Sequence, residues 1–277
     1  MNLPEFLTVK QQLASHGIQD VGAVVHERLT DASVTDSIKP GQRVAIAIGS
    51  RGIDRIDEVA GAVVSYVKSL DAQPLIVPAM GSHGGATAEG QRATLAALGV
   101  TPQSVGCPVE SSMETVEIGE SINGLKIYFD QVAASADHLI VVNRIKPHTR
   151  LIGPIQSGLC KMLMIGLGKR EGAIAFHPAF RSMDYRLDRI TDQVIPTILQ
   201  KTPFLLGLAL VENSHDSIGK IEVIAGDQLL AREPSLLKTA SDWMPKLPFE
   251  TAELLIIDAI GKEISGTGLD TDSYTHL

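Results

Sequence analysis

Apolar side chains recur along the chain with two spacings, one typical of strands and one typical of helices. Residues 43–48 include alternating β-branched side chains and end at a Gly-Ser-Arg-Gly loop. After this loop, apolar positions recur every three or four residues over 56–70, which predicts a helix with one buried face. The unit then repeats, with a buried strand at 75–77, a loop at 81–87 and a helix at 88–98. This repetition predicts a parallel sheet covered by helices.

Patterns further along the chain extend the same architecture. Apolar runs at 125–129 and 139–142 predict two more strands, and the second run is typical of a central strand. The other expected elements are a short first helix at 4–15, a buried helix at 159–165, a helix at 184–199, an antiparallel-like pair of strands at 205–212 and 220–225, and a helix around 232–242. The expected fold class is therefore α/β, an open and mostly parallel sheet with flanking helices.

The end of the chain differs from the rest. Pro245, Pro248 and their polar neighbours are typical of a linker, and a new strand is expected from Glu253 to Ala259. We therefore expect an N-terminal α/β domain at 1–247, followed at 248–277 by a linker and the start of a second, smaller α/β domain. So short a segment cannot form its own core, so either it packs on the first domain or the second domain is incomplete.

Composition and charge exclude several classes of protein. The 277 residues include 24 Lys and Arg against 32 Asp and Glu, a net charge of −8, without a basic run that would suit nucleic acid or an anionic membrane surface. No apolar run approaches the roughly 20 residues of a membrane-spanning helix. The first residues lack the pattern of a signal peptide, so we expect a cytoplasmic protein. Two cysteines are too few for a disulfide framework, a Cys-ligated zinc site or an iron–sulfur cluster. The oligomeric state is left open.

Three loops that follow predicted strands carry the candidate chemistry, because ligands of parallel α/β sheets gather at the carboxyl ends of strands. The first loop holds Arg51, and the second holds His83 among glycines that allow close approach of a ligand. The third holds His148 between two cations, Lys146 and Arg150, which suits a carboxylate substrate and a neutral imidazole base. For both histidines, a solvated loop residue is the alternative.

A lysine in an apolar segment is the fourth candidate. Lys161 lies within Leu159 to Ile165, where loss of solvation lowers the pKa of an amine and favours a nucleophile or covalent anchor. The alternative is a lysine whose stem covers the core while its amine reaches solvent. His177 follows sixteen positions later and could return toward Lys161, although a histidine packed in the core is the alternative there.

The order of His83, His148, Lys161 and His177 resembles the nickel-dependent lactate racemase family, as do the Gly-Ser-His-Gly-Gly loop and the sixteen-residue interval. The resemblance extends over roughly residues 40–180. It implies a nickel pincer nucleotide, derived from nicotinate and linked to Lys161 as a thioamide, with His177 completing the nickel coordination. A neutral imidazole suits nickel.

The same resemblance implies roles for the loops. Ser157 and Gly158, at the end of the third loop, are expected to bind the cofactor, and Arg51 is expected to hold the substrate carboxylate. His83 and His148 would form the acid/base pair of a racemase or epimerase acting on a 2-hydroxy acid by hydride transfer. Partners would be that small molecule and the enzymes that make the cofactor, without nucleic acid or membrane.

The substrate and two other functions stay open at this stage. Residues 263–270 lack the tyrosine, glutamine and downstream lysine of lactate-specific members, so a sugar acid or a malate-like acid fits as well as lactate. The alternatives to a racemase are an oxidoreductase that stops at the 2-oxo acid and a non-catalytic carboxylate-binding protein.

Overall fold

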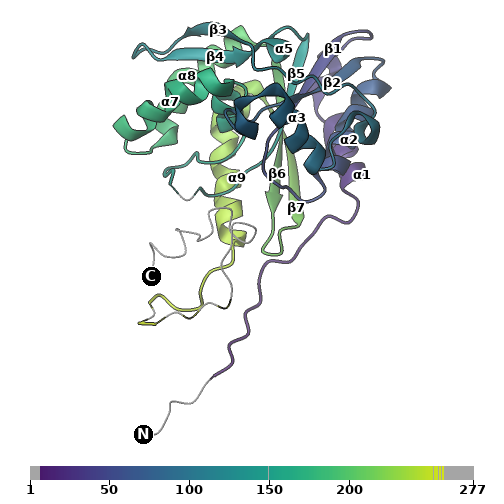
Figure 1. Cartoon of the computed structure of the whole chain (residues 1–277). Coiled ribbons are helices and arrows are strands. Elements are labelled where there is room, and N and C mark those ends of the chain that lie inside the picture. Colours follow the sequence, from purple (N-terminus) through teal and green to yellow (C-terminus); the bar gives the residue numbers. More distant parts are fainter. Residues whose placement is uncertain (1–6, 149, 252, 255, 257, 259–277) are drawn as a thin grey trace, which may run out of the picture.

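The structure is a computed structural model that describes residues 7–148, 150–251, 253, 254, 256 and 258; the side chain of His177 is also outside the description. Figure 1 shows a central sheet with helices packed on both of its faces. The strands are β1 (Arg43–Ile48), β2 (Gln73–Pro78), β3 (Thr115–Glu120), β4 (Lys126–Asp130), β5 (His138–Arg144), β6 (Phe204–Glu212) and β7 (Ile218–Ala225). The α-helices are α1 (Val21–Thr30), α2 (Ile56–Ser69), α3 (Ala88–Ala97), α4 (Pro102–Val105), α5 (Gln131–Ala134), α6 (Leu159–Lys161), α7 (Lys169–Ser182), α8 (Leu187–Lys201) and α9 (Leu229–Trp243). A π-helical turn, Met162–Gly166, follows α6 directly.

Among the described residues, five strands form the main sheet in the order β2-β1-β5-β6-β7. The pairs β1–β2, β1–β5 and β5–β6 are parallel, whereas β7 pairs antiparallel with β6. Strands β3 and β4 form a separate antiparallel ribbon. The sheet is therefore mostly parallel, which confirms the expected fold class.

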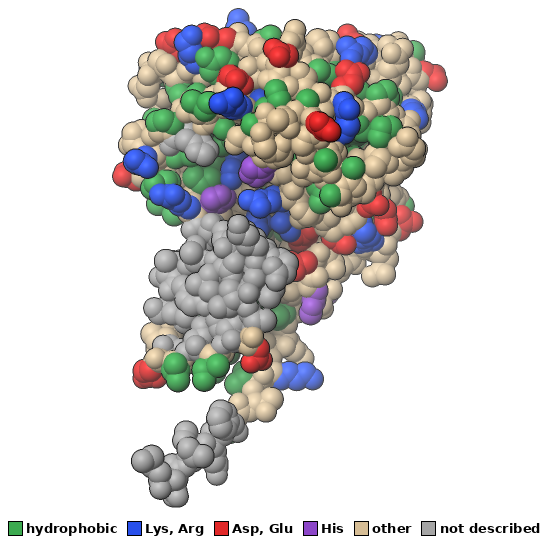
Figure 2. All heavy atoms as spheres, in the orientation of Figure 1, with side chains coloured by type: hydrophobic (Ala, Val, Ile, Leu, Met, Phe, Trp, Pro, Cys, Tyr) green, Lys and Arg blue, Asp and Glu red, His purple; other side chains and the backbone are tan. Residues whose placement is uncertain are grey.

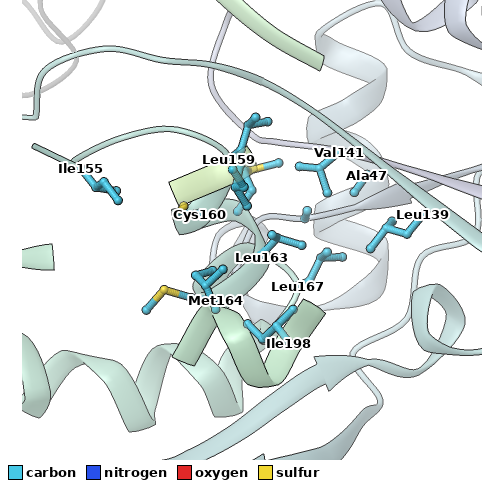
Figure 3. Packing of buried hydrophobic residues seen from close by; sticks show 14 of the residues in the cluster. Ala47, Leu139, Val141, Ile155, Leu159, Cys160, Leu163, Met164, Leu167 and Ile198 are labelled. Atoms are coloured by element: carbon cyan, nitrogen blue, oxygen red, sulfur yellow. The ribbon is translucent and has the colours of Figure 1, made fainter. Parts of the chain in front are cut away.

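Alternate side chains of the strands pack into two different layers. Val44 and Ile46 of β1 join a buried cluster with the apolar face of α2, whereas Ala45 and Ala47 face a second cluster on the other side of the sheet. In that second cluster, side chains of α6 and the π turn pack near β1 and β5 (Figure 3). Burial on both faces explains why these strands are apolar throughout rather than alternating.

Most expected elements are present, and their ends agree within a few residues. Thr87 caps α3, where its side-chain oxygen accepts a hydrogen bond from the amide of Gly90 at 3.0 Å. The expected pair of late strands is present as β6 and β7, antiparallel as predicted. Within the described residues, no helix combines the length and apolar composition needed to cross a membrane.

One expectation differs from the structure, several elements were not predicted, and one expectation stays a prediction. The first helix predicted at 4–15 is wrong over its described part, because residues 7–15 have no regular structure and the chain enters its first helix at α1. Spacing of a few apolar residues alone does not supply the packing that stabilises a short helix. Conversely, α1, α7 and β3 and the short helices α4 and α5 were not predicted. The proposed boundary at 247/248 stays a prediction, because the strand expected at 253–259 lies in a stretch that is only partly described.

Candidate active site

The three candidate loops meet at one edge of the sheet. Ile48 at the end of β1 is in register with Pro78 of β2 and with Val142 of β5, and all three strands run in the same direction. The loops that follow them therefore leave the sheet side by side, as expected for parallel strands. Arg51 lies in the first loop, His83 in the second and His148 in the third.

Charged groups of the three loops act on one another at this edge. The positive charges of Arg51 and Lys161 lower the pKa of His83. Those of Lys161, Lys146 and Arg51 lower the pKa of His148. Lys161 is in turn affected by Arg51 and Lys146. Figure 2 shows histidine side chains gathered beside Lys and Arg side chains on one face of the molecule. The structure thus brings together two imidazoles and three cations, an arrangement that attracts anions.

Lys161 is placed by the buried residues around it. Leu159 and Cys160 are fully buried, as are Leu163 and Met164, and they hold the segment against the sheet (Figure 3). Lys161 itself is only partly buried. Burial first, and then the charges of Arg51 and Lys146, lower the pKa of Lys161 to about 8. About a tenth of this amine is therefore uncharged at pH 7, far more than for an ordinary lysine. The lowered pKa agrees with the sequence-based interpretation.

The π turn after Lys161 connects this segment with the His83 loop. The amide of Leu167 donates to the carbonyl of Met162, and the carbonyl of Gly166 accepts from the amide of Gly81 at 2.9 Å. A Cβ on Gly166 would lie 2.7 Å from the carbonyl oxygen of Ala79, so this approach requires glycine. A π turn is an uncommon structure often found at functional sites, and here it brings two candidate segments into backbone contact.

His83 interacts with a hydroxyl group from the neighbouring loop. Its Nδ1 lies 2.5 Å from Oγ of Ser50, a residue that the sequence analysis did not single out. Partial desolvation of the ring, followed by the charges of Arg51 and Lys161, lowers the pKa of His83. The imidazole is therefore mostly neutral at pH 7 and able to accept a proton.

His148 is held by backbone groups of its own loop. Its Nδ1 accepts hydrogen bonds from the amides of Arg150 at 3.0 Å and Leu151 at 3.1 Å, and its own amide donates to Oε1 of Gln156 at 2.8 Å. Burial, followed by the charges of Lys161, Lys146 and Arg51, lowers the pKa of His148 to about 4. This imidazole stays neutral at physiological pH, as the cationic loop led us to expect.

The loop returns to the sheet through Ser157 and Gly158. The amide of Lys146 donates to the carbonyl of Ser157 at 3.0 Å, and Nδ2 of Asn143 donates to the carbonyl of Gly158 at 3.0 Å. Glu233 of α9 also contacts this segment, because its Oε2 accepts a hydrogen bond from the amide of Cys160 at 2.9 Å. These bonds fix the backbone that leads into Lys161.

A buried polar network formed by Gln91, Lys169 and Asp130 supports the His83 loop. Nε2 of Gln91 donates to the carbonyls of Gly81 at 2.8 Å and His83 at 3.3 Å. Nζ of Lys169 donates to Oε1 of Gln91 at 3.0 Å and lies 3.0 Å from Oδ2 of Asp130. Gln91, Lys169 and Asp130 are fully buried, so this network ties the loop to the core.

Sequence reasoning missed these supporting residues for identifiable reasons. Glu233 interrupts an apolar helical stripe formed by Leu229, Leu236 and Leu237, and an acid at such a position is a detectable signal. Ser50 and Gln91 carry no such signal, because polar residues are ordinary in loops and on helices. Ser50 contacts a loop 33 positions away, and Gln91 contacts Lys169, 78 positions away.

His177 lies in helix α7, while its side chain is outside the described residues. Its role as a metal ligand therefore remains a prediction. Among the side chains that the structure describes, no group of three or more His, Cys, Asp or Glu residues is arranged to hold a metal ion.

Comparisons with known proteins agree with this fold. The sequence model of the family described as the lactate racemase N-terminal domain matches residues 5–187, which is more than half of the chain. The chain therefore belongs to the lactate racemase N-terminal domain family. Among solved structures it is similar to the lactate racemase apoprotein from Thermoanaerobacterium thermosaccharolyticum, with a TM-score of 0.58 and 16% identity. The match covers 79% of this chain and 55% of that racemase, so the chain spans little more than half of its length. A search of curated proteins found no match.

Proposed function

We propose that this protein is a racemase or epimerase of a 2-hydroxy acid and uses a nickel pincer nucleotide tethered to Lys161. The observation that carries the proposal is the cluster of Arg51, Lys146 and Lys161 beside two neutral imidazoles, in a chain of the lactate racemase N-terminal domain family. Such a cluster suits an anionic substrate and an anionic mononucleotide.

The residues present fit the proposed group. Lys161 supplies an amine with a lowered pKa for an amide-type link, Ser157 and Gly158 border it in the chain, and His177 would provide the metal ligand. When bound, this group would accept the α-hydrogen of the substrate as hydride and return it to either face. Its synthesis would require separate enzymes, which are proposed partners of the chain.

The other side chains act on the substrate. Arg51 would hold the carboxylate through charge-assisted hydrogen bonds, and His83 and His148 would handle the hydroxyl proton as the acid/base pair. The lowered pKa values of both imidazoles keep them neutral at physiological pH, as a proton acceptor must be. The substrate class proposed is a 2-hydroxy acid, with sugar acids and malate-like acids included beside lactate.

Intact mass and nickel content, measured on protein produced together with the cofactor-making enzymes, test the proposal. We expect a mass increase that maps to Lys161, is absent in Lys161→Ala, and persists in the control Lys238→Ala, whose side chain is 76% exposed on α9. Nickel should be near-stoichiometric and fall in His177→Ala. His83→Ala and His148→Ala should keep the cofactor and lose racemisation. An unmodified, nickel-free wild-type chain under these conditions would contradict the proposal.

The two alternatives predict different products. An oxidoreductase would accumulate the 2-oxo acid in stoichiometric amounts instead of the opposite enantiomer. A carboxylate-binding protein would bind 2-hydroxy acids in a calorimetric titration without any turnover. The racemase predicts formation of the opposite enantiomer without net accumulation of the oxo acid.

A further inference from the structure

The segment that holds the ring of His148 is itself held by a residue of a distant turn. The amides of Arg150 and Leu151 donate hydrogen bonds to Nδ1 of His148 at 3.0 Å and 3.1 Å. The next amide, that of Ile152, donates to the carbonyl of Tyr185 at 3.0 Å. Tyr185 lies between α7 and α8, 35 positions after Arg150. One residue therefore contacts the short segment 150–152 that orients the imidazole.

The side chain of Arg150 reaches the same tyrosine. Its Nη2 donates a hydrogen bond to the hydroxyl of Tyr185, and its guanidinium carbon lies 4.3 Å from the centroid of the tyrosine ring. A cation over the face of an aromatic ring is attracted by the ring electrons. The ring also packs against the buried cluster that includes Leu163 and Leu187. The guanidinium of Arg150 is thus bound by a residue that the core holds in place.

The turn that carries Tyr185 has an uncommon backbone conformation. Asp184 and Tyr185 are successive residues with positive φ angles of 54° and 57°, which are unfavourable for a bulky side chain. Such a conformation persists only where its surroundings hold it. Here the amide of Tyr185 donates to the carbonyl of Phe180 at 2.8 Å, and the amide of Arg186 donates to that of Met183 at 3.0 Å. Strain of this kind is concentrated at functional sites.

Close packing between the loop and the turn continues one residue further. A Cβ on Gly153, whose φ is 100°, would lie 2.4 Å from Oδ1 of Asp188. Asp188 in turn pairs with Arg186, whose Nη2 lies 2.7 Å from Oδ2. Ile152 also forms an isolated β-bridge with Arg186. The His148 loop and the turn therefore fit closely, so a shift of the turn would displace the loop.

We propose that Tyr185 and Arg150 are positioning residues for His148. Tyr185 fixes the segment 150–152 through its carbonyl and its side chain, and the amides of that segment fix the imidazole. Arg150 acts through this contact and is not a ligand of the substrate carboxylate, a role that stays with Arg51. His148 keeps its place in the acid/base pair, because the contact sets only where its ring lies. The effect on turnover rests on the proposed function, whereas the contact itself does not.

Hydrogen exchange of the full chain, followed by nuclear magnetic resonance without cofactor or substrate, tests the contact. In Tyr185→Leu and in Arg150→Gln, exchange at the amide of Leu151 should accelerate about fivefold, as expected for the loss of one ordinary hydrogen bond. Amides of β1 and β5 should keep their rates. The control Arg28→Gln, at an exposed position of α1, should change none of these rates. Unchanged exchange at Leu151 in both variants would overturn the proposal.

Enzyme loaded with cofactor tests the effect on His148. A catalytic group displaced by about 1 Å can lose about 10²-fold in rate, so Tyr185→Leu and Arg150→Gln should lower kcat by about ten- to 10²-fold. The KM for the 2-hydroxy acid should stay the same, because Arg51 is untouched. A raised KM with unchanged kcat in Arg150→Gln would mean that Arg150 binds the substrate, which contradicts the proposal. Absence of racemisation in the loaded wild type would instead refute the proposed function and leave the exchange result standing.

A double variant separates this contact from a general loss of structure. Residues that act through one contact have non-additive effects, so Tyr185→Leu combined with Arg150→Gln should lose no more kcat than the more affected single variant. Tyr185→Phe keeps the ring beneath the guanidinium and its packing on the core, so its kcat should lie between those of the wild type and Tyr185→Leu. Losses that multiply in the double variant would show that the two residues act independently.

Discussion

The loops that carry His83 and His148 are held in place by different kinds of interaction. The His83 loop is tied to a fully buried polar group, Gln91, which in turn contacts the buried Lys169, and to the backbone of Gly166. The His148 loop contacts Tyr185 through the amide of Ile152, and it also has local bonds that involve no fully buried polar group, including both bonds of Gln156. Damage to the buried anchors of the first loop should therefore affect the whole fold, whereas loss of the Gln156 bonds in the second should stay local.

The largest loss of stability is expected for Lys169→Met. This substitution removes the cation that faces Asp130 in a fully buried pair and leaves an uncompensated carboxylate. Burial already lowers the pKa of Lys169, and Asp130 opposes this shift, so the two charges depend on each other. We expect a loss of about 3–5 kcal/mol in the free energy of unfolding, measured by denaturant titration.

The matched control is Lys238→Met, which removes a lysine from an exposed pair with Asp242. Exposed pairs of this kind contribute about 0.3–0.5 kcal/mol. Equal stabilities of the two variants would show that the buried pair does not anchor the fold.

A pH-dependent effect is expected at Glu233, which lies under the end of the His148 loop. Burial raises the pKa of Glu233 to about 7, from an ordinary value of 4.5, and its Oε1 has no hydrogen-bond partner among the described protein atoms. Between pH 4.5 and 7 the folded protein keeps this proton while the unfolded chain has released it. The contribution of this group to stability therefore falls as pH rises through the window, by up to about 3 kcal/mol.

Glu233→Gln cannot ionise and should flatten this part of the stability profile, so that the variant gains relative to the wild type as pH rises from 5 to 8. Glu89→Gln, at an exposed position of α3, is the control and should leave the profile unchanged. Unfolding experiments at several pH values make the comparison. If stability changed with pH in the same way in Glu233→Gln and in the wild type, the raised pKa of Glu233 would be contradicted.

A smaller effect is expected for Gly158→Ala. A Cβ there would lie 2.3 Å from Oε1 of Glu233, so the glutamate or the loop must shift, at a cost of about 1–3 kcal/mol. In Gly61→Ala, the new methyl group on helix α2 meets no described atom within 4 Å apart from its chain neighbours and the backbone of its own helix. That control should gain about 0.5–1 kcal/mol, because alanine favours helix. Thermal unfolding of both variants measures the difference.

The smallest effect is expected for Gln156→Ala in the His148 loop. The substitution removes two local hydrogen bonds, one from the amide of His148 and one to the carbonyl of Gly153. The free energy of unfolding should change by about 1 kcal/mol or less. Hydrogen exchange at the amide of His148 should accelerate, while that of the buried strands stays the same. Faster exchange throughout the sheet would mean that this loop is coupled to the core.

Several elements and site residues of these two loops could be predicted from the sequence. Strand β1 and helix α2 were predictable because apolar residues recur with a period set by local geometry. The positions of Arg51, His83 and His148 at strand ends followed from the parallel topology. Helix α7 was missed because its start at Lys169 follows Gly166 and Gly168, and closely spaced glycines are typical of a turn.

The amino-acid sequence by itself determined the α/β class, the order of the main strands and helices, and the family to which the chain belongs. These features depend on local periodicity and on motifs read along one segment. Only the tertiary structure decided that Ser50 meets His83, that Gln91 and Lys169 support the His83 loop, and that Glu233 lies beneath Gly158. Apart from the bond of Gln91 to the nearby Gly81, these contacts join segments far apart in the chain, so ordinary polar residues acquire their roles only when the fold brings them together.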